Sequence, residues 1–568
     1  NEEHSHDKAE PMNEELDIED VAPGLVLFFT LAGGVLRLLL LNSKSMWLDE
    51  TFSVWMAGHS LPDMLHWIVQ IDQHPPLYYG LLHYWMMFTG DTPRDVRMLS
   101  VLFGTATIPI IYLIGKRISG QVAGVAAAMF MALSLFNVVY AQETRMYTLL
   151  TFNASLAIYA LVRLLTDPRS ARPIGSQFWD ALRPGRTPVP VEPAPKKDFS
   201  YRDESTQTGW RTWFRWSSVQ AVETDLAWVG FILFSALTLL THNTAVLFWF
   251  TVNVFVLGLM LFQRLSKLGS QPTFQAPSFW NWVKAQVGIF LLWSLWLSAF
   301  LQQARRVDQQ FWIPKPTWDA VLQTLKTFLN DSTPNRQGMS DMVLIVYVLI
   351  LLLGLWHFRK NLSRFLFLAA LFILPFAAEL LVSLRRPIFS DRTLIWTTIP
   401  LFLALGAGIA QLKFRPLIFV TLVSLGAFNL FSDGDYFRFY QKEDWDTPAG
   451  YVANFAEQDD LVLFNSNFVV VSFDYYFKPY KEKYSIEVME RGLPLDLYMD
   501  GVLEPKMTRD DVPALLALIQ GHKRVWLVYS HDWYTDPLGL IPQTLASQMK
   551  VTREREFYGG RVILYEAP

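Results

Sequence analysis

The sequence Trp47-Leu48-Asp49-Glu50-Thr51-Phe52 opens a stretch, residues 46–84, that lies between two apolar segments. The first of these apolar segments covers residues 24–41. Two adjacent carboxylates, Asp49 and Glu50, therefore emerge from the end of a predicted membrane span. A carboxylate is costly to place at a membrane face and marks a candidate functional site there. The alternative is that both carboxylates are solvated or cap a helix at the membrane surface.

The composition is typical of a polytopic membrane protein. Of its 568 residues, 52% are hydrophobic and 18% are charged, whereas soluble proteins average about 25% charged residues. The low content of charged residues is due to apolar runs that are long enough to cross a bilayer, which takes about 20 residues each. We expect about eleven spans, at residues 24–41, 97–116, 122–140, 146–166, 226–241, 244–262, 284–302, 341–357, 363–383, 393–411 and 415–431.

The charge pattern and the absence of cysteine exclude several classes of function. No basic patch stands clear of the membrane, so a nucleic-acid partner is not expected. The chain has no Cys, which excludes disulfides, thiolate metal sites and a cysteine nucleophile.

Lys and Arg gather in alternate loops, and such loops face the cytoplasm. This rule places the acidic tail, residues 1–23, in the cytoplasm, where we expect it to be disordered. It also places the Pro- and Arg-rich loop 167–225 there. That loop ends in Trp210-Arg211-Thr212-Trp213, a pattern typical of an amphipathic helix on the inner leaflet. The loop 42–96 and the C-terminus then lie outside, so we predict a multi-pass protein of the cytoplasmic membrane.

The chain changes character after residue 431, and residues 432–568 are predicted to form an extracytoplasmic α/β domain. Strand-like runs of β-branched and aromatic residues occupy 461–464, 468–472, 525–529 and 562–565. Helices are expected at 449–457, 512–520 and 538–549, which suggests a small, partly parallel sheet. The domain is expected to act as a lid or to guide the acceptor; the alternative is a cap that only stabilises the fold.

Four motifs carry a resemblance to a known family. In order, they are Trp47-Leu48-Asp49-Glu50-Thr51-Phe52, His74-Pro75-Pro76-Leu77-Tyr78-Tyr79, Arg97-Met98-Leu99-Ser100 and Tyr140-Ala141-Gln142-Glu143-Thr144-Arg145-Met146-Tyr147. The chain thereby resembles the bacterial family-39-type glycosyltransferases, relatives of the protein O-mannosyltransferases and of the lipid A aminoarabinose transferase. The resemblance covers residues 1–165 well and the later spans only in layout. It implies the GT-C fold for residues 24–431, a polyprenyl-phosphate sugar donor, and sugar transfer outside the cytoplasmic membrane.

The resemblance implies that Asp49 is the general base that deprotonates an acceptor hydroxyl. Glu50 would raise the pKa of Asp49 by like-charge repulsion or orient a partner, and Glu143 is a further acid candidate. The leaving lipid phosphate needs positive charge, which Arg supplies through bidentate contacts. The phosphate-binding candidates are Arg97, Arg145, Arg385, Arg386 and Arg392. One alternative is that Arg385, Arg386 and Arg392 extend to lipid headgroups. Another is that Arg97 and Arg145 form salt bridges to Asp91, Asp95 or Glu143 that brace the fold.

Further residues of these motifs are candidates for binding substrate. They are His74, Tyr78, Tyr79, Gln142 and Tyr147. No cofactor is expected with certainty, and a divalent metal held by His74 with Glu50 or Asp72 is left open. Alternatively, His74 before Pro75 and Pro76 forms a rigid loop corner, and the aromatic residues belong to the membrane interface.

The resemblance therefore implies an inverting glycosyltransferase that moves a hexosyl or pentosyl group from a polyprenyl phosphate to a glycan, lipid or protein acceptor. The alternative from a different class is a scaffold subunit without activity, or a transporter. A transporter is expected to show broken helices in two matched halves, and no such symmetry is seen in the sequence.

Overall fold

The computed structural model describes residues 18–177, 223–265, 274–306, 315–330, 337–497 and 505–568. Residues 1–17 of the predicted tail and 178–222 of the predicted inner loop, including the Trp- and Arg-rich segment, lie outside these ranges. Residues 18–23, which were expected to belong to the disordered tail, instead form the first turns of helix α1 (Ile18–Leu38).

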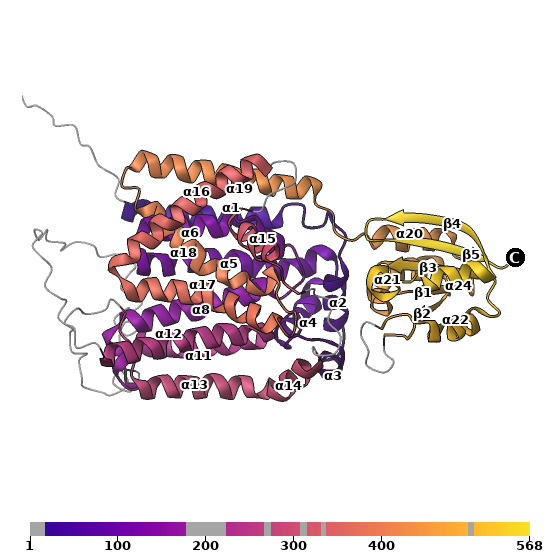
Figure 1. Cartoon of the computed structure of the whole chain (residues 1–568), viewed down its shortest axis with the longest axis horizontal. Helices are drawn as coiled ribbons and strands as arrows, with labels where there is room; N and C mark the ends of the chain where they lie inside the picture. The colour runs from indigo at the N-terminus through magenta and orange to yellow at the C-terminus, as the bar shows by residue number, and fades with distance from the viewer. Residues whose placement is uncertain (1–17, 178–222, 266–273, 307–314, 331–336, 498–504) are drawn as a thin grey trace, which may run out of the picture.

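A bundle of long apolar helices makes up most of the molecule (Figure 1). In the described residues, ten helices are long and apolar enough to cross a membrane, and a bent pair brings the number to eleven. The spanning helices are α1, α5 (Pro93–Ser119), α6 (Gln121–Leu133) with α7 (Leu135–Ala141), α8 (Tyr147–Thr166), α11 (Glu223–Thr241), α12 (Val246–Leu265), α13 (Phe279–Trp293) with α14 (Leu297–Arg306), α16 (Gln337–His357), α17 (Leu362–Ser383), α18 (Thr398–Ala410) and α19 (Arg415–Phe439). The chain is thus a multi-pass membrane protein, with its spans near the predicted places.

Helices α6, α8 and α18 form the centre of the bundle, where nearly every residue of α6 and α18 is buried. Close approach depends on glycine: a Cβ at Gly354 of α16 would lie 2.0 Å from the carbonyl oxygen of Ala404 in α18. Small residues at such contacts let membrane helices pack backbone to backbone. Helices α13 and α16 expose many large apolar side chains, as expected for helices that face lipid.

Three short helices cover one end of the bundle. They are α2 (Leu48–Ala57), α3 (Leu61–Ile71) and α4 (Leu77–Thr89). Figure 1 shows them between the bundle and the C-terminal domain. Helix α15 (Trp318–Asn330) packs against α7 and α16, and the 3-10 segment η6 (Asp391–Thr397) leads into α18. Segment η6 carries Arg392 and packs against α8, which begins at Tyr147.

The C-terminal domain is a five-stranded sheet in the order β2-β1-β3-β5-β4. Its strands are β1 (Leu461–Phe464), β2 (Met489–Gly492), β3 (Arg524–Ser530), β4 (Lys550–Phe557) and β5 (Gly560–Glu566). Strand β1 pairs parallel with β2 and β3, whereas β5 pairs antiparallel with β3 and β4. Helices α20 (Asp446–Phe455) and α21 (Val470–Tyr484) contribute to one apolar core, and α22 (Val512–Ile519) and α24 (Leu540–Gln548) to a second. The domain is therefore an α/β sandwich with a mixed sheet.

One predicted strand is wrong. Residues 468–472 fall in the 3-10 turn Asn467–Val469 and in the first residues of α21, not in a strand. A short apolar run has no periodicity that separates a strand from a buried helix, and here Phe473 and Phe477 continue the apolar face at helical spacing. Strands β2 and β4 were missed because they are largely exposed, and β4 is rich in charge, as edge strands are.

Candidate active site

Asp49 lies in the first turn of α2, beside two arginines that come from distant parts of the chain. Its Oδ2 accepts a hydrogen bond from Nη1 of Arg392 at 3.0 Å, and Nη2 of Arg145 lies 3.8 Å from the same oxygen. Arg145 also donates through Nη1 to the carbonyl oxygen of Asp49 and to Oγ of Ser53, each at 3.2 Å. The Asp49 side chain remains 26% exposed. We call Asp49, Arg145 and Arg392 the open cluster.

The two arginines decide the charge of Asp49. Burial alone would raise the pKa of this carboxyl, but the positive charges of Arg145 and Arg392 outweigh burial and hold the pKa below its ordinary value of 3.8. The sequence suggested that Glu50 raises the pKa of Asp49, and this suggestion is wrong because the two cations dominate. Asp49 is therefore ionised at neutral pH and able to accept a proton.

Glu50 points into a different, closed environment. Its Oε1 accepts from Nε of Arg97 at 2.7 Å and from the backbone N–H of Thr144 at 3.0 Å. Its Oε2 accepts from Nη2 of Arg97 at 2.8 Å and from Nζ of Lys442 at 3.0 Å. The side chain is fully buried. Burial would raise the pKa of Glu50, but Arg97 and Lys442 hold it well below its usual range. Both oxygens are occupied, so the geometry favours a structural role over the catalytic role expected for Glu50.

Arg97 completes this environment as a brace. Beyond Glu50, its Nη1 donates to the carbonyl oxygens of Leu41 and Lys44 at 2.7 and 3.0 Å, and its Nη2 donates to that of Ser45 at 3.1 Å. The side chain is buried and its donors are engaged. The predicted role of Arg97 in binding phosphate is therefore not supported. The alternative of a bracing salt bridge fits, but its partner is Glu50 and not the expected Asp91, Asp95 or Glu143.

The sequence analysis missed Lys442. This residue lies between α19 and α20, and its Nζ contacts Glu50, Oε1 of Glu143 at 3.5 Å, and the carbonyl oxygen of Gln142 at 3.3 Å. One signal was available in the sequence. Lys442 follows the last span on the predicted outer side, where basic residues are less frequent, so a basic residue there suggests an anionic partner. We call Glu50, Arg97 and Lys442 the closed cluster.

Glu143 lies beside the closed cluster but is not saturated by it. Its side chain is only 5% exposed, and its Oε2 has no hydrogen-bond partner among the described residues. Burial raises the pKa of Glu143 above its ordinary value although Lys442 lowers it, and the negative charges of Glu50 and Asp49 add to the rise. Glu143 is therefore a poorer candidate for contact with substrate than the more exposed Asp49.

Several predicted substrate-binding residues are inside the protein. Tyr78 and Tyr79 are fully buried, and the hydroxyl of Tyr78 lies 3.2 Å from Oγ of Ser100. Gln142 is buried, and its Nε2 donates to the carbonyl oxygens of residues 37 and 39, at the end of α1. Tyr147 is buried with its ring 6.0 Å from the guanidinium carbon of Arg392. Tyr147 therefore packs beside the open cluster, and the burial of the three tyrosines does not support sugar stacking.

His74 forms the expected loop corner. Its Nδ1 lies 2.9 Å from Oδ1 of Asp72, and its ring packs 5.0 Å from that of His242. The described residues contain no group of three or more His, Asp or Glu side chains placed to hold a metal ion. Glu50 is bound to Arg97 and Lys442, so the hypothesis of a metal on His74 and Glu50 gains no support. Asp72, the other expected ligand, does lie beside His74, and a metal on this pair stays a prediction.

The other two candidate arginines between α17 and η6 are placed differently from Arg392. Arg385 is exposed, and Arg386 donates through Nη1 to the carbonyl oxygen of Ala304 at 3.1 Å. Of the five arginines predicted to bind phosphate, Arg145 and Arg392 are the two that reach Asp49.

Comparison with known proteins agrees with this architecture. Residues 73–179 match the family described as dolichyl-phosphate-mannose-protein mannosyltransferase. This segment contains Arg145 but begins after Asp49. The structure is similar to that of ArnT from Cupriavidus metallidurans bound to undecaprenyl phosphate, with a TM-score of 0.52 and 12% identity, over 96% of this chain and 98% of that chain. It is also similar to the apo oligosaccharyltransferase of Archaeoglobus fulgidus, with a TM-score of 0.50 and 10% identity, over 96% and 74% of the two chains. No curated protein matches the chain in sequence.

The fold is that of the GT-C membrane glycosyltransferases, and it extends over nearly the whole chain. Within that class, residues 73–179 carry the mannosyltransferase-like match. The family resemblance seen in the sequence is thereby confirmed.

Proposed function

We propose that the protein is an inverting glycosyltransferase that moves a sugar from a polyprenyl-phosphate donor to an acceptor hydroxyl. The observation that carries the proposal is the open cluster, in which a partly exposed carboxylate lies beside two arginines. A base and a pair of guanidinium groups are the parts that this reaction needs. The match to the mannosyltransferase family and the binding of undecaprenyl phosphate by a protein of the same fold support the choice of donor.

In the proposed reaction, the oxygen of the acceptor hydroxyl attacks the anomeric carbon of the donor sugar, and Asp49 takes the proton of that hydroxyl. The bond between that carbon and the phosphate oxygen breaks, and its electron pair leaves with the lipid phosphate. Arg392 and Arg145 neutralise the charge on the phosphate through hydrogen bonds. One displacement at the anomeric carbon inverts its configuration.

The same arginines predict the order of binding, with the donor before the acceptor. Before the donor binds, Arg145 and Arg392 hold the pKa of Asp49 low, which makes Asp49 a weak base. A donor phosphate that shares these arginines draws positive charge away from Asp49. The pKa of Asp49 then rises toward the range in which a general base works well. Donor binding thus prepares the base for the acceptor.

We also propose that α2 and the C-terminal domain lie outside the cytoplasmic membrane. The chain has no native Cys, so single cysteines at two exposed positions report the two sides of the membrane: Lys413, between α18 and α19, and Ser547, in the C-terminal domain. We expect an impermeant maleimide to label Ser547→Cys and not Lys413→Cys in intact cells. Labelling of both, or of Lys413→Cys alone, would contradict the orientation.

The proposed function is tested by incubating the purified protein with a panel of polyprenyl-phosphate sugars, cell-envelope lipids and glycans. We expect release of the lipid phosphate with at least one donor and its loss in Asp49→Asn. Absence of release for the whole panel, with donor binding intact, would favour the non-catalytic alternative.

A further inference from the structure

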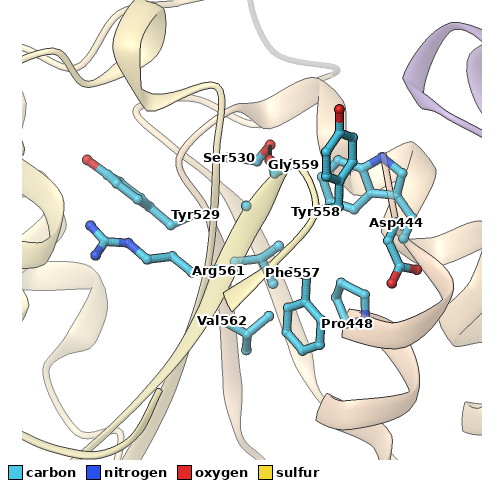
Figure 2. Close-up of a pocket in the computed structure, with 12 residues that line it drawn as sticks. Asp444, Pro448, Tyr529, Ser530, Phe557, Tyr558, Gly559, Arg561 and Val562 are labelled. Carbon is cyan, nitrogen blue, oxygen red and sulfur yellow. Dashed lines mark hydrogen bonds between the residues drawn. The ribbon is translucent and has the colours of Figure 1, made fainter. Parts of the chain in front are cut away.

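Two cavities involve the C-terminal domain, and they differ greatly in size. The one shown in Figure 2 lies beside Asp444, Ser530 and Gly559 and has a volume of about 10 Å³. That is close to the minimum that holds one water molecule, so it offers no ligand site. The other lies between the C-terminal domain and α2 and has a volume of about 450 Å³. Cavities of about 300–1,000 Å³ are the size that holds small organic ligands.

The larger cavity, which we call the seam cavity, has walls from both parts of the molecule. Helix α2 supplies Thr51 and Trp55, α21 supplies Asp474 and Tyr475, and β2 with the residues after it supplies Glu490 and Asp496. It lies at the carboxyl end of β2 and beside the segment that connects the carboxyl end of β1 to α21. In open α/β sheets, ligands bind outside the carboxyl ends of parallel strands. The position of the seam cavity in the fold is thus one that favours binding.

The polar groups of the seam cavity fit an uncharged ligand. Lys481 lies 3.1 Å from Oδ1 of Asp474 and also contacts Glu490. Arg491 lies 3.8 Å from Oδ2 of Asp496, whose Oδ1 accepts from the backbone N–H of Gly492 at 2.6 Å. The carboxylates therefore have basic partners. Lys478 also lines the cavity, so the lining holds two basic side chains, Lys478 and Arg491, and three carboxylates, Asp474, Glu490 and Asp496. This lining has no excess of positive charge for a phosphate. Carboxylates are acceptors only, and the basic side chains are donors only, so a ligand with several hydroxyls satisfies both.

Two aromatic side chains provide an apolar surface beside these groups. Trp55 and Tyr475 are both half-buried, and the hydroxyl of Tyr475 donates to the carbonyl oxygen of Asp91 at 2.6 Å. That bond fixes the ring of Tyr475 across the seam between the two domains. A wall of aromatic rings next to hydrogen-bonding groups suits the alternating apolar and hydroxyl faces of a sugar ring.

The seam cavity lies on the opposite side of α2 from the open cluster. Asp49 and Ser53 are four residues apart, on the face that meets Arg145, whereas Thr51 and Trp55 form a second such pair facing the cavity. A helix with its side chains is about 10–12 Å across. An occupant that also presents a hydroxyl to Asp49 must therefore extend beyond a single sugar unit.

We propose that the seam cavity binds neutral sugar units of an extended glycan acceptor, away from the hydroxyl that reacts. This inference rests on the proposed glycosyltransferase function for the role of its ligand, but the binding itself does not depend on turnover. The C-terminal domain then selects acceptors by holding a part of the chain that is not modified.

The test is equilibrium binding of neutral trisaccharides, namely maltotriose, mannotriose and N,N′,N″-triacetylchitotriose, to the full-length protein in detergent without donor. Glucose 6-phosphate serves as the anionic comparison. We expect saturable binding of at least one trisaccharide and weaker or no binding of the sugar phosphate. Asp474→Asn and Trp55→Leu should each weaken trisaccharide binding about tenfold or more. The matched control is Glu482→Gln, an exposed carboxylate of the same helix α21 outside the cavity lining, which should bind as the wild type does.

Thermal unfolding of each variant shows whether it is folded, and Tyr475→Leu serves as the second variant if Trp55→Leu is not. The inference is overturned if no trisaccharide binds saturably to the wild type, if glucose 6-phosphate binds more tightly, or if the cavity variants bind like Glu482→Gln. A protein that binds trisaccharides but never releases lipid phosphate would refute the proposed function and leave this site standing. The reverse result would refute the site alone.

Discussion

Asp49 and Glu50 are neighbours in sequence, yet their side chains in the open and closed clusters differ in exposure and in hydrogen bonding. Asp49 keeps 26% of its side chain exposed and has its arginines at 3.0 and 3.8 Å. Glu50 is fully buried, with four hydrogen bonds to Arg97, Lys442 and Thr144. Both carboxylates are ionised, because cations outweigh burial in each case. Only Asp49 combines that charge with access, so the difference separates a residue that can react from one that holds the helix.

The largest expected effect comes from removing the negative charge of Asp49 in the open cluster. Asp49→Asn should lower transfer by about 100- to 10,000-fold, the usual contribution of a general base, while the protein still unfolds cooperatively and binds donor. Initial rates of lipid phosphate release at saturating donor measure the effect. Asp63→Asn, an exposed carboxylate of the adjacent α3, is the matched control and should keep the wild-type rate. A normal rate in Asp49→Asn would remove Asp49 from the mechanism.

The closed cluster should respond in stability rather than in chemistry. Arg97→Met leaves Glu50 buried with Lys442 as its remaining cation, and breaking such a pair costs about 3–5 kcal/mol. We expect a clear fall in the midpoint of thermal unfolding in detergent. Arg385→Met, at an exposed arginine of the same end of the bundle, should leave the midpoint unchanged. Equal midpoints for the two variants would mean that the closed cluster is not a brace.

Donor affinity should depend on the open cluster alone. Arg392→Ala removes a charge-assisted contact worth about 1.5–3 kcal/mol, or about tenfold or more in donor affinity. Arg392→Lys should also weaken binding, because Lys lacks the planar pair of donors. Equilibrium binding of the polyprenyl-phosphate sugar measures both, with Arg386→Ala as the comparison. If Arg392→Ala binds donor like the wild type, the phosphate site lies elsewhere and Arg145 becomes the first residue to test.

The sequence predicted the membrane spans well, because an apolar run of span length is decided by local composition. It also named Asp49 as the base and included Arg145 and Arg392 among five candidate arginines, and the fold brings these three residues together. The resemblance gave the role of base to Asp49, but the sequence could not show that Glu50 is enclosed by cations, since its partners are distant in the chain. Lys442 is one such partner, 392 positions from Glu50.

The C-terminal domain was harder to predict in detail. Residues 468–472 were predicted as a strand because a short apolar run does not by itself distinguish a strand from a buried helix. Strand β4 was missed because its exposed charges resemble those of a loop. In both cases the decisive information is tertiary: α21 packs on the sheet, and β4 is held by pairing with β5.

The pH dependence of the transfer rate tests most directly whether Asp49 is the base. A base acts only when deprotonated, so the rate is lost as the pH falls through its pKa, and kcat/KM reports that pKa in the free enzyme. Because Arg145 and Arg392 keep the pKa of Asp49 below 3.8, kcat/KM should stay level from pH 8 down to about pH 5. The fall in kcat should begin at a higher pH than the fall in kcat/KM, since the bound phosphate shares the arginines. The pKa of Glu143 is instead raised above 4.5. A fall in kcat/KM well above pH 5 that disappears in Glu143→Gln would therefore contradict the account and make Glu143 the base.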